Sequence, residues 1–153
     1  MRFFVIILLL ATSNIHAQKV REMRFDEFEQ LTKINDSKTY VFNFWATWCK
    51  PCIAELPNFI KVADEYQQNI EVIFVSLDFV RDKQKVEQFV IENRINSRVV
   101  LLNEPDYDSW INRVNPVWSG ALPATLILNK NKREFYEQSF DYQQLVDEIR
   151  HFF

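Results

Sequence analysis

The chain has 153 residues, of which 48% are hydrophobic and 25% are charged, and its formal net charge at pH 7 is −3. This length and composition predict one globular domain with a full hydrophobic core and no second domain. The mild acidity gives no indication of nucleic-acid binding. Cysteine occurs at two positions, Cys49 and Cys52, and glycine at one, Gly120.

The first residues have the pattern of an export signal. Arg2 is followed by an apolar run from Phe3 to Ala11 and by a small residue, Ala17, before a plausible cleavage site. The apolar run is well short of the roughly 20 residues that span a bilayer as a helix, which disfavours the alternative of an uncleaved anchor. We therefore expect a signal peptide over residues 1–17 and a mature, periplasmic or otherwise extracytoplasmic domain over 18–153.

Apolar periodicity predicts alternating helices and strands along the rest of the chain. The expected elements are, in chain order, a helix over 25–31, a strand over 39–46, a helix over 51–67 interrupted by Pro57, a strand over 70–77, a helix over 82–93, a strand over 98–102, a helix over 107–114, strands over 124–128 and 133–138, and a helix over 142–149. Strand–helix–strand alternation implies parallel pairing with right-handed crossovers, and the polar turn over 129–132 implies an antiparallel hairpin. The predicted fold class is α/β, with a mixed central sheet covered by helices on both faces in three layers.

The most informative stretch is Trp48-Cys49-Lys50-Pro51-Cys52, which lies between a predicted strand and a predicted helix. At a helix N-terminus, Cys49 is expected to be exposed and Cys52 partly covered one turn later, so that one sulfur attacks and the other resolves. Free N–H groups of the first turn and the helix dipole stabilise a thiolate at Cys49, and the charge of Lys50 acts in the same direction. Pro51 suits the first turn, where no N–H is required.

A zinc site and a structural staple are the alternative interpretations of this cysteine pair. A structural zinc site usually takes four Cys or His ligands, whereas the chain has two cysteines and two histidines, and His16 lies in the expected signal. A bridge across two intervening residues restricts the unfolded chain very little. The spacing therefore favours a redox-active dithiol, and export agrees with it because disulfides persist outside the cytosol.

Three strings of residues resemble the thioredoxin fold, and the resemblance covers the chain from about residue 20 onward. They are Asn43-Phe44-Trp45-Ala46-Thr47-Trp48-Cys49-Lys50-Pro51-Cys52, Cys52-Ile53-Ala54-Glu55-Leu56-Pro57 and Gly120-Ala121-Leu122-Pro123-Ala124-Thr125. The second string, with the extra helix and strand between the two halves of the fold, is similar to exported TlpA/ResA-type thiol–disulfide oxidoreductases. The resemblance implies an extracytoplasmic αβ-inserted thioredoxin-like protein that reduces disulfides of partner proteins, which in relatives include apocytochromes awaiting haem.

The resemblance also assigns roles to single residues. It places Pro123 in a cis peptide beside the cysteines, where the backbone of Leu122 would pair with an extended substrate segment; an ordinary strand-initiating proline is the alternative. Asn43 stands where thioredoxin has a buried aspartate that moves the proton of the resolving cysteine, which asparagine cannot do. Glu55 is the candidate for that role because it follows Cys52 by three residues on the helix; the alternative is a solvated helix acid.

The tryptophans divide between the site and the core. Trp48 is expected to shield the disulfide and to offer an apolar docking surface, and Trp118 to border the substrate groove. Packing explains Trp45, which also shapes the floor of the site, and Trp110. The candidate site residues are, for catalysis, Cys49, Cys52, Glu55 and Pro123 and, for substrate binding, Trp48, Lys50, Pro51, Leu122 and Trp118.

The leading hypothesis is an exported protein-disulfide reductase in which the Cys49 thiolate attacks a partner disulfide and Cys52 resolves the mixed disulfide. We expect a monomer without cofactor or metal, which receives electrons from an upstream membrane or periplasmic dithiol donor. The alternatives are a disulfide-donating oxidase or isomerase, a peroxidase of peroxiredoxin-like layout, and a non-catalytic thioredoxin-fold module that binds exported partners. The direction of electron flow depends on the relative stability of the two redox states, which the sequence does not determine.

Overall fold

The structure, a computed structural model, describes residues 20–153, so the expected export signal and cleavage site lie outside the described residues. Within residues 20–153, no helix combines the length and the apolar character needed to cross a membrane. The described chain forms a six-stranded sheet and five α-helices. In chain order these are β1 (Arg21–Met23), α1 (Phe25–Leu31), β2 (Thr39–Trp45), α2 (Lys50–Glu65), β3 (Ile70–Ser76), α3 (Lys83–Glu92), β4 (Arg98–Leu102), α4 (Tyr107–Val114), β5 (Ala124–Leu128), β6 (Arg133–Tyr136) and α5 (Tyr142–Arg150).

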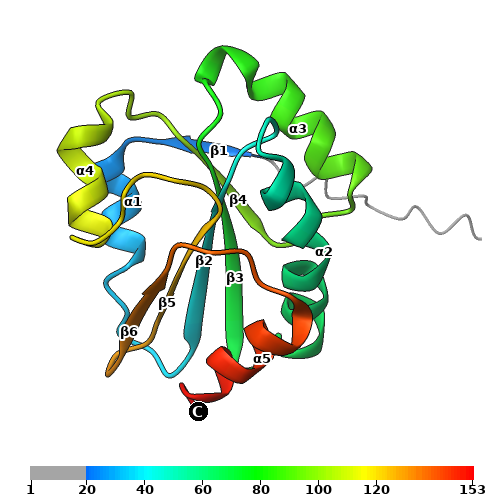
Figure 1. The fold of residues 1–153 in the computed structure, drawn as a ribbon, viewed down its shortest axis with the longest axis vertical. Coiled ribbons are helices and arrows are strands. Elements are labelled where there is room, and N and C mark those ends of the chain that lie inside the picture. The colour runs from blue at the N-terminus through cyan, green and yellow to red at the C-terminus, as the bar shows by residue number, and fades with distance from the viewer. Residues whose placement is uncertain (1–19) are drawn as a thin grey trace, which may run out of the picture.

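The strands follow the order β1-β4-β3-β2-β5-β6 across the sheet. The first four of these strands are mutually parallel, and β5 runs antiparallel to both β2 and β6. Figure 1 shows α1 and α4 on one face of the sheet and α2, α3 and α5 on the other. The predicted three-layer α/β fold with a mixed sheet is therefore confirmed.

Side chains of β2 alternate between two hydrophobic clusters, one on each face of the sheet. Val41 and Trp45 pack on the α2 side, whereas Phe42 and Phe44 pack on the side of α1 and α4. Both faces of the sheet are buried at β2. This explains why the sequence of β2 is an almost continuous apolar run and does not alternate between apolar and polar residues. Asn43 interrupts this run on the α2 face, where every neighbouring side chain of the strand is apolar.

The structure adds one strand that the sequence pattern did not predict. β1 pairs in parallel with β4, from Arg21 opposite Val100 to Met23 opposite Leu102. Two of its three residues are exposed and charged, so the strand carries no apolar run or alternation that periodicity could detect. The other differences are small: α2 continues through Pro57 but ends at Glu65, two residues before the predicted end.

Candidate active site

The two cysteines form a disulfide at the amino terminus of α2, with their sulfurs 2.00 Å and their Cα atoms 5.3 Å apart. Cys49 is the N-cap residue of the helix, and its Sγ accepts a hydrogen bond of 3.3 Å from the backbone N–H of Cys52. An N–H group of the first turn is thus directed at the Cys49 sulfur. This is the geometry by which a helix terminus stabilises a thiolate.

Cys49 is less accessible than the sequence predicted. Its residue surface is 6% exposed, while Cys52 is completely buried. The expectation of an exposed first cysteine is wrong for the disulfide state, because Cys49 belongs to the hydrophobic cluster under α2, against which Leu122 also packs. The expected order holds, since Cys49 remains the more accessible of the two. The neighbouring Trp48 is 60% exposed, so its indole presents apolar surface to solvent.

A buried carboxylate fixes the loop that leads from β2 into Cys49. Asp78, just after β3, accepts hydrogen bonds from the backbone N–H of Thr47 at 2.9 Å, from the Thr47 hydroxyl at 2.6 Å and from the Ser76 hydroxyl at 2.8 Å. The sequence predictions did not include Asp78. Its place after the carboxyl end of a buried parallel strand was the available signal, because ligand sites of such sheets gather at that edge.

Asp78→Ala is expected to lower the free energy of unfolding by about 2–4 kcal/mol, because it leaves one N–H and two hydroxyl groups without their acceptor. Asp78→Asn should lose less, since its amide oxygen still accepts. Urea unfolding of the disulfide form measures both. The control is Asp64→Ala, which removes an exposed acid of α2 and should change stability by less than about 0.5 kcal/mol. A loss no larger than that of the control would show that Asp78 does not hold the loop.

Glu55 is buried in the α2 side of the core and is not a solvated helix acid, being 3% exposed. Its Oε1 accepts a hydrogen bond from Asn43 Nδ2 at 2.9 Å, and its Oε2 accepts one from the backbone N–H of Phe140 at 2.8 Å. Burial raises the pKa of Glu55 to about 7, against the opposing effect of these two hydrogen bonds. A carboxyl group with this pKa can take up and release a proton near neutral pH.

Asn43 has the hydrogen-bonding capacity to serve both protonation states of Glu55. It lies opposite Thr125 of β5, and its Oδ1 is buried without a hydrogen-bond partner in the described part of the chain. Rotation of the amide by half a turn would present this oxygen to a protonated Glu55, whose O–H could then donate to it. The asparagine itself does not titrate, so Glu55 is the ionisable member of this hydrogen-bonded pair.

The Leu122–Pro123 peptide bond is cis, as the resemblance implied. Pro123 is buried, and Leu122 is partly buried against both hydrophobic clusters. Gly120, in the loop before this bond, has a φ of +90°, a backbone conformation that glycine adopts without strain. The single glycine of the chain therefore lies in the loop that carries the proline.

Trp118 was expected to border the substrate groove, but the structure buries it below the loop, with 3% of its surface exposed. Its indole packs against Phe44 and Trp110, and its Nε1 donates a hydrogen bond of 2.9 Å to the Ala121 carbonyl. In this position Trp118 supports the loop from within the core. Trp110 and Trp45 are core residues as predicted.

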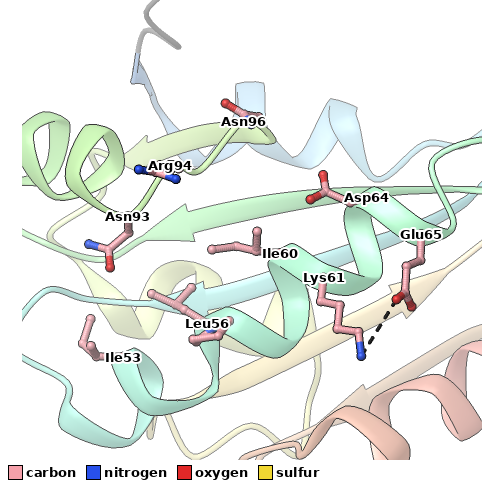
Figure 2. A pocket seen from close by; sticks show the side chains of 10 residues that line it. Ile53, Leu56, Ile60, Lys61, Asp64, Glu65, Asn93, Arg94 and Asn96 are labelled. Atoms are coloured by element: carbon pink, nitrogen blue, oxygen red, sulfur yellow. Dashed lines mark ion pairs between the residues drawn. The ribbon is translucent and has the colours of Figure 1, made fainter.

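Two hollows lie beside the helix that carries the cysteines. The larger, about 640 Å³, is formed by α2 and the Asn93–Asn96 segment, and Figure 2 shows Ile53, Leu56 and Ile60 of α2 along it. Trp48 does not line it. The smaller, about 420 Å³, is lined by Trp48, Leu77, Tyr107, Asp108, Ile111 and the loop residues Ser119, Gly120 and Leu122, and we call it the Trp48 groove. It adjoins both Cys49 and the cis proline in sequence, which makes it the candidate substrate surface.

The mixed sheet, the helix that begins at a Cys-x-x-Cys disulfide and the cis proline before β5 place the protein in the thioredoxin-like α/β class. Within this class the chain belongs to the AhpC/TSA family, whose profile matches residues 17–133.

Several proteins of similar sequence are named thiol–disulfide oxidoreductases. The thiol-disulfide oxidoreductase ResA of Geobacillus thermodenitrificans is 32% identical over 95 residues, which are 61% of this chain and 50% of the relative. Sporulation thiol-disulfide oxidoreductase A of Bacillus subtilis is 30% identical over 81 residues, covering 52% of this chain and 49% of the relative. The chain thus spans about half the length of these curated relatives, and they support the predicted TlpA/ResA-like resemblance.

Solved structures support the fold. A DsbF homologue from Corynebacterium diphtheriae superposes with a TM-score of 0.63 at 22% identity, over 76% of this chain and 73% of that one. A thioredoxin-like protein from Porphyromonas gingivalis gives a TM-score of 0.57 at 26% identity, over 77% of both chains.

Proposed function

We propose that the protein is a thiol–disulfide oxidoreductase that reduces disulfides of partner proteins through Cys49 and Cys52. The observation that carries this proposal is the disulfide at the start of α2, where the N–H of Cys52 meets the Cys49 sulfur. A purely structural disulfide in this position would close a loop too small to stabilise the fold appreciably. A dithiol in this position has an activated attacking sulfur and a buried resolving sulfur.

The proposed reaction starts from the reduced protein. The Cys49 thiolate attacks one sulfur of the partner disulfide, the partner's S–S bond breaks, and its other sulfur leaves as a thiolate that takes up a proton. Cys52 then loses its proton and attacks the Cys49 sulfur of the mixed disulfide, which releases the second partner thiol and forms the Cys49–Cys52 disulfide. Two electrons pass to the partner, and an upstream membrane or periplasmic dithiol donor restores the dithiol.

Glu55 is the proposed acceptor of the Cys52 proton. It lies one turn after Cys52 on the same helix, and both side chains are buried. Its pKa of about 7 lets it act as a general base near neutral pH. Pro123 and Leu122 are proposed to bound the substrate surface, with the Leu122 backbone pairing with an extended segment of the partner. Exposed Lys50 and Pro51 complete that surface beside Trp48.

Location and partners belong to the same proposal. Residues 1–17 would be an export signal, and residues 18–153 would act as a monomer, without a bound cofactor, in the periplasm or another extracytoplasmic space. The partners would be exported proteins with disulfides, apocytochromes among them. The names of the curated relatives support the chemistry of this proposal.

The equilibrium reduction potential of the Cys49/Cys52 pair tests the proposal. It can be measured in a dithiothreitol or glutathione series by the fluorescence of Trp45 and Trp48, together with the rate of insulin reduction. A potential near that of thioredoxin, about −270 mV, supports a reductase, whereas one near about −120 mV would indicate a disulfide-donating oxidase. If a variant that lacks both cysteines still bound the partner proteins, the protein would be a binding module. Steady consumption of peroxide in the presence of a thiol donor would indicate a peroxidase.

A further inference from the structure

We propose that the Trp48 groove binds a basic side chain, lysine or arginine, next to the disulfide cysteine of the partner. The inference rests on the proposed oxidoreductase function and names its substrate class: partner proteins with a basic residue beside the reducible disulfide. It stands on the lining of the groove, on its charge and on its place beside Cys49.

The walls of the groove suit the long alkyl stem of lysine or arginine. Leu77, Ile111 and Leu122 supply aliphatic surface, and Trp48 and Tyr107 supply aromatic rings that are 60% and 39% exposed. Basic side chains bury their methylene stems along apolar surface while the charged end stays hydrated. Exposed aromatic faces also attract cations, indole most strongly.

The charge of the groove favours a cation over an anion. Asp108 is exposed and is the charged residue in the lining; no lysine or arginine lines the groove, and Lys50, although exposed near Trp48, is not among its lining residues. Within residues 20–153 the Asp108 carboxylate makes no ion pair and no side-chain hydrogen bond. Asp108 also lies in the first turn of α4, where a carboxylate suits the helix dipole. This interaction engages neither carboxylate oxygen in a hydrogen bond, so both can accept from a ligand.

The wall opposite α4 is fixed before any partner binds. Glu137 accepts hydrogen bonds from the backbone N–H and hydroxyl of Ser119, and the Ala121 carbonyl accepts one from the Trp118 indole. A Cβ at Gly120 would come within 3.1 Å of Ile111 Cδ1, so the glycine lets the loop lie close against α4. A preformed wall reduces the entropy lost on binding.

The groove lies where the residue next to the partner's cysteine would bind. Trp48 directly precedes Cys49, and Leu122 directly precedes the cis proline. A partner segment that reaches the Cys49 sulfur and runs along Leu122 therefore has its neighbouring side chain over the groove. The larger hollow along α2 has no such charge preference, because Lys61 and Arg94 line it together with Asp64 and Glu65, and Lys61 pairs with Glu65 at 3.9 Å (Figure 2).

Three disulfide-linked peptides that differ only in the residue beside the cysteine test the proposal. That residue is lysine, norleucine or glutamate, and the rate constant for reduction by the reduced protein is measured by stopped flow. At low salt we expect the lysine peptide to react about three to ten times faster than the glutamate peptide, with norleucine between them. The difference should shrink at 1 M salt, where charges are screened beyond about 3 Å.

Asp108→Asn should remove most of the difference between the rates for the lysine and the glutamate peptides, because it removes the charge that distinguishes them. Asp108→Lys should reverse the preference. The control is Asp64→Asn, which makes the same change in net charge at the larger hollow and should leave the preference as it is.

Equal rates for all three peptides, or a preference that survives Asp108→Lys, would overturn the inference and leave the proposed function intact. Failure of the wild-type dithiol to reduce any of the peptides or insulin would overturn the proposed function and, with it, this inference.

Discussion

Cys49→Ser is expected to abolish insulin reduction, with a loss of about three orders of magnitude or more, because a serine hydroxyl at neutral pH cannot replace the attacking thiolate. Cys52→Ser should instead retain the first attack and lose the second. Its mixed disulfide with a partner should therefore accumulate, since the sulfur that resolves it is missing. The Cys52 backbone N–H that meets the Cys49 sulfur is kept in this variant, so the attacking thiolate remains stabilised.

The trapped complex is measured by mass spectrometry of the quenched reaction and by non-reducing electrophoresis. The control is the double variant Cys49→Ser, Cys52→Ser, which should form no mixed disulfide. Insulin reduction by Cys49→Ser at a rate near that of the wild type would contradict the mechanism. Equal trapping by both single variants would contradict the assignment of Cys49 as the attacking sulfur, which rests on its greater exposure and its place at the N-cap.

The fold was largely predictable because its strongest signals are local. Buried β2 and β3 are covered on both faces and so read as apolar runs, and the predicted bounds of α1 and α4 agree with the structure. β1 was missed because two of its three residues face solvent and its hydrogen-bond partners lie about eighty residues later, in β4. Pairing of this kind depends on tertiary contacts that leave no local pattern.

The site was predictable only in part, for a similar reason. The cysteines share one short string with Trp48 and Pro51, and their chemistry follows from spacing. Asp78 reaches the same loop from the end of a different strand, 31 positions after Thr47. The buried Glu55 carboxylate likewise accepts a hydrogen bond from the backbone N–H of Phe140, which is 85 positions away, just before α5. Contacts across such separations are invisible to periodicity and spacing.

Asn43 and Glu55 together show how the core tolerates an ionisable group. Asn43, in the middle of β2, donates to one oxygen of the carboxylate, and the backbone N–H of Phe140 before α5 donates to its other oxygen. Asn58 of α2 donates in turn to the Phe140 carbonyl at 3.0 Å, so this backbone unit is held to the helix at both ends. Two donors reduce the penalty of burying the charge without removing it, because the pKa of Glu55 remains raised.

Glu55 should therefore make the stability of the disulfide form depend on pH. Its pKa is about 7 in the folded protein and about 4.5 in the unfolded chain, so the folded state holds the proton more tightly. Its contribution to stability is fully present below about pH 4.5 and is lost as the pH rises through about 7, a change of about 3 kcal/mol. Glu55→Gln should remove this dependence, whereas Asp64→Asn, which neutralises an exposed acid of the same helix, should keep it. Urea unfolding at a series of pH values measures the difference.

The same variant tests the proposed proton transfer. In the wild type, resolution of the mixed disulfide should accelerate as the pH rises through about 7, because ionised Glu55 accepts the Cys52 proton. Glu55→Gln should slow resolution about a hundredfold near neutral pH and lose this inflection, while the initial attack by Cys49 changes little. Stopped-flow measurement separates the two steps. If the inflection near pH 7 persists in Glu55→Gln, the proton passes to another group, and burial of Glu55 serves only to join α2 to the segment before α5 through the Phe140 N–H.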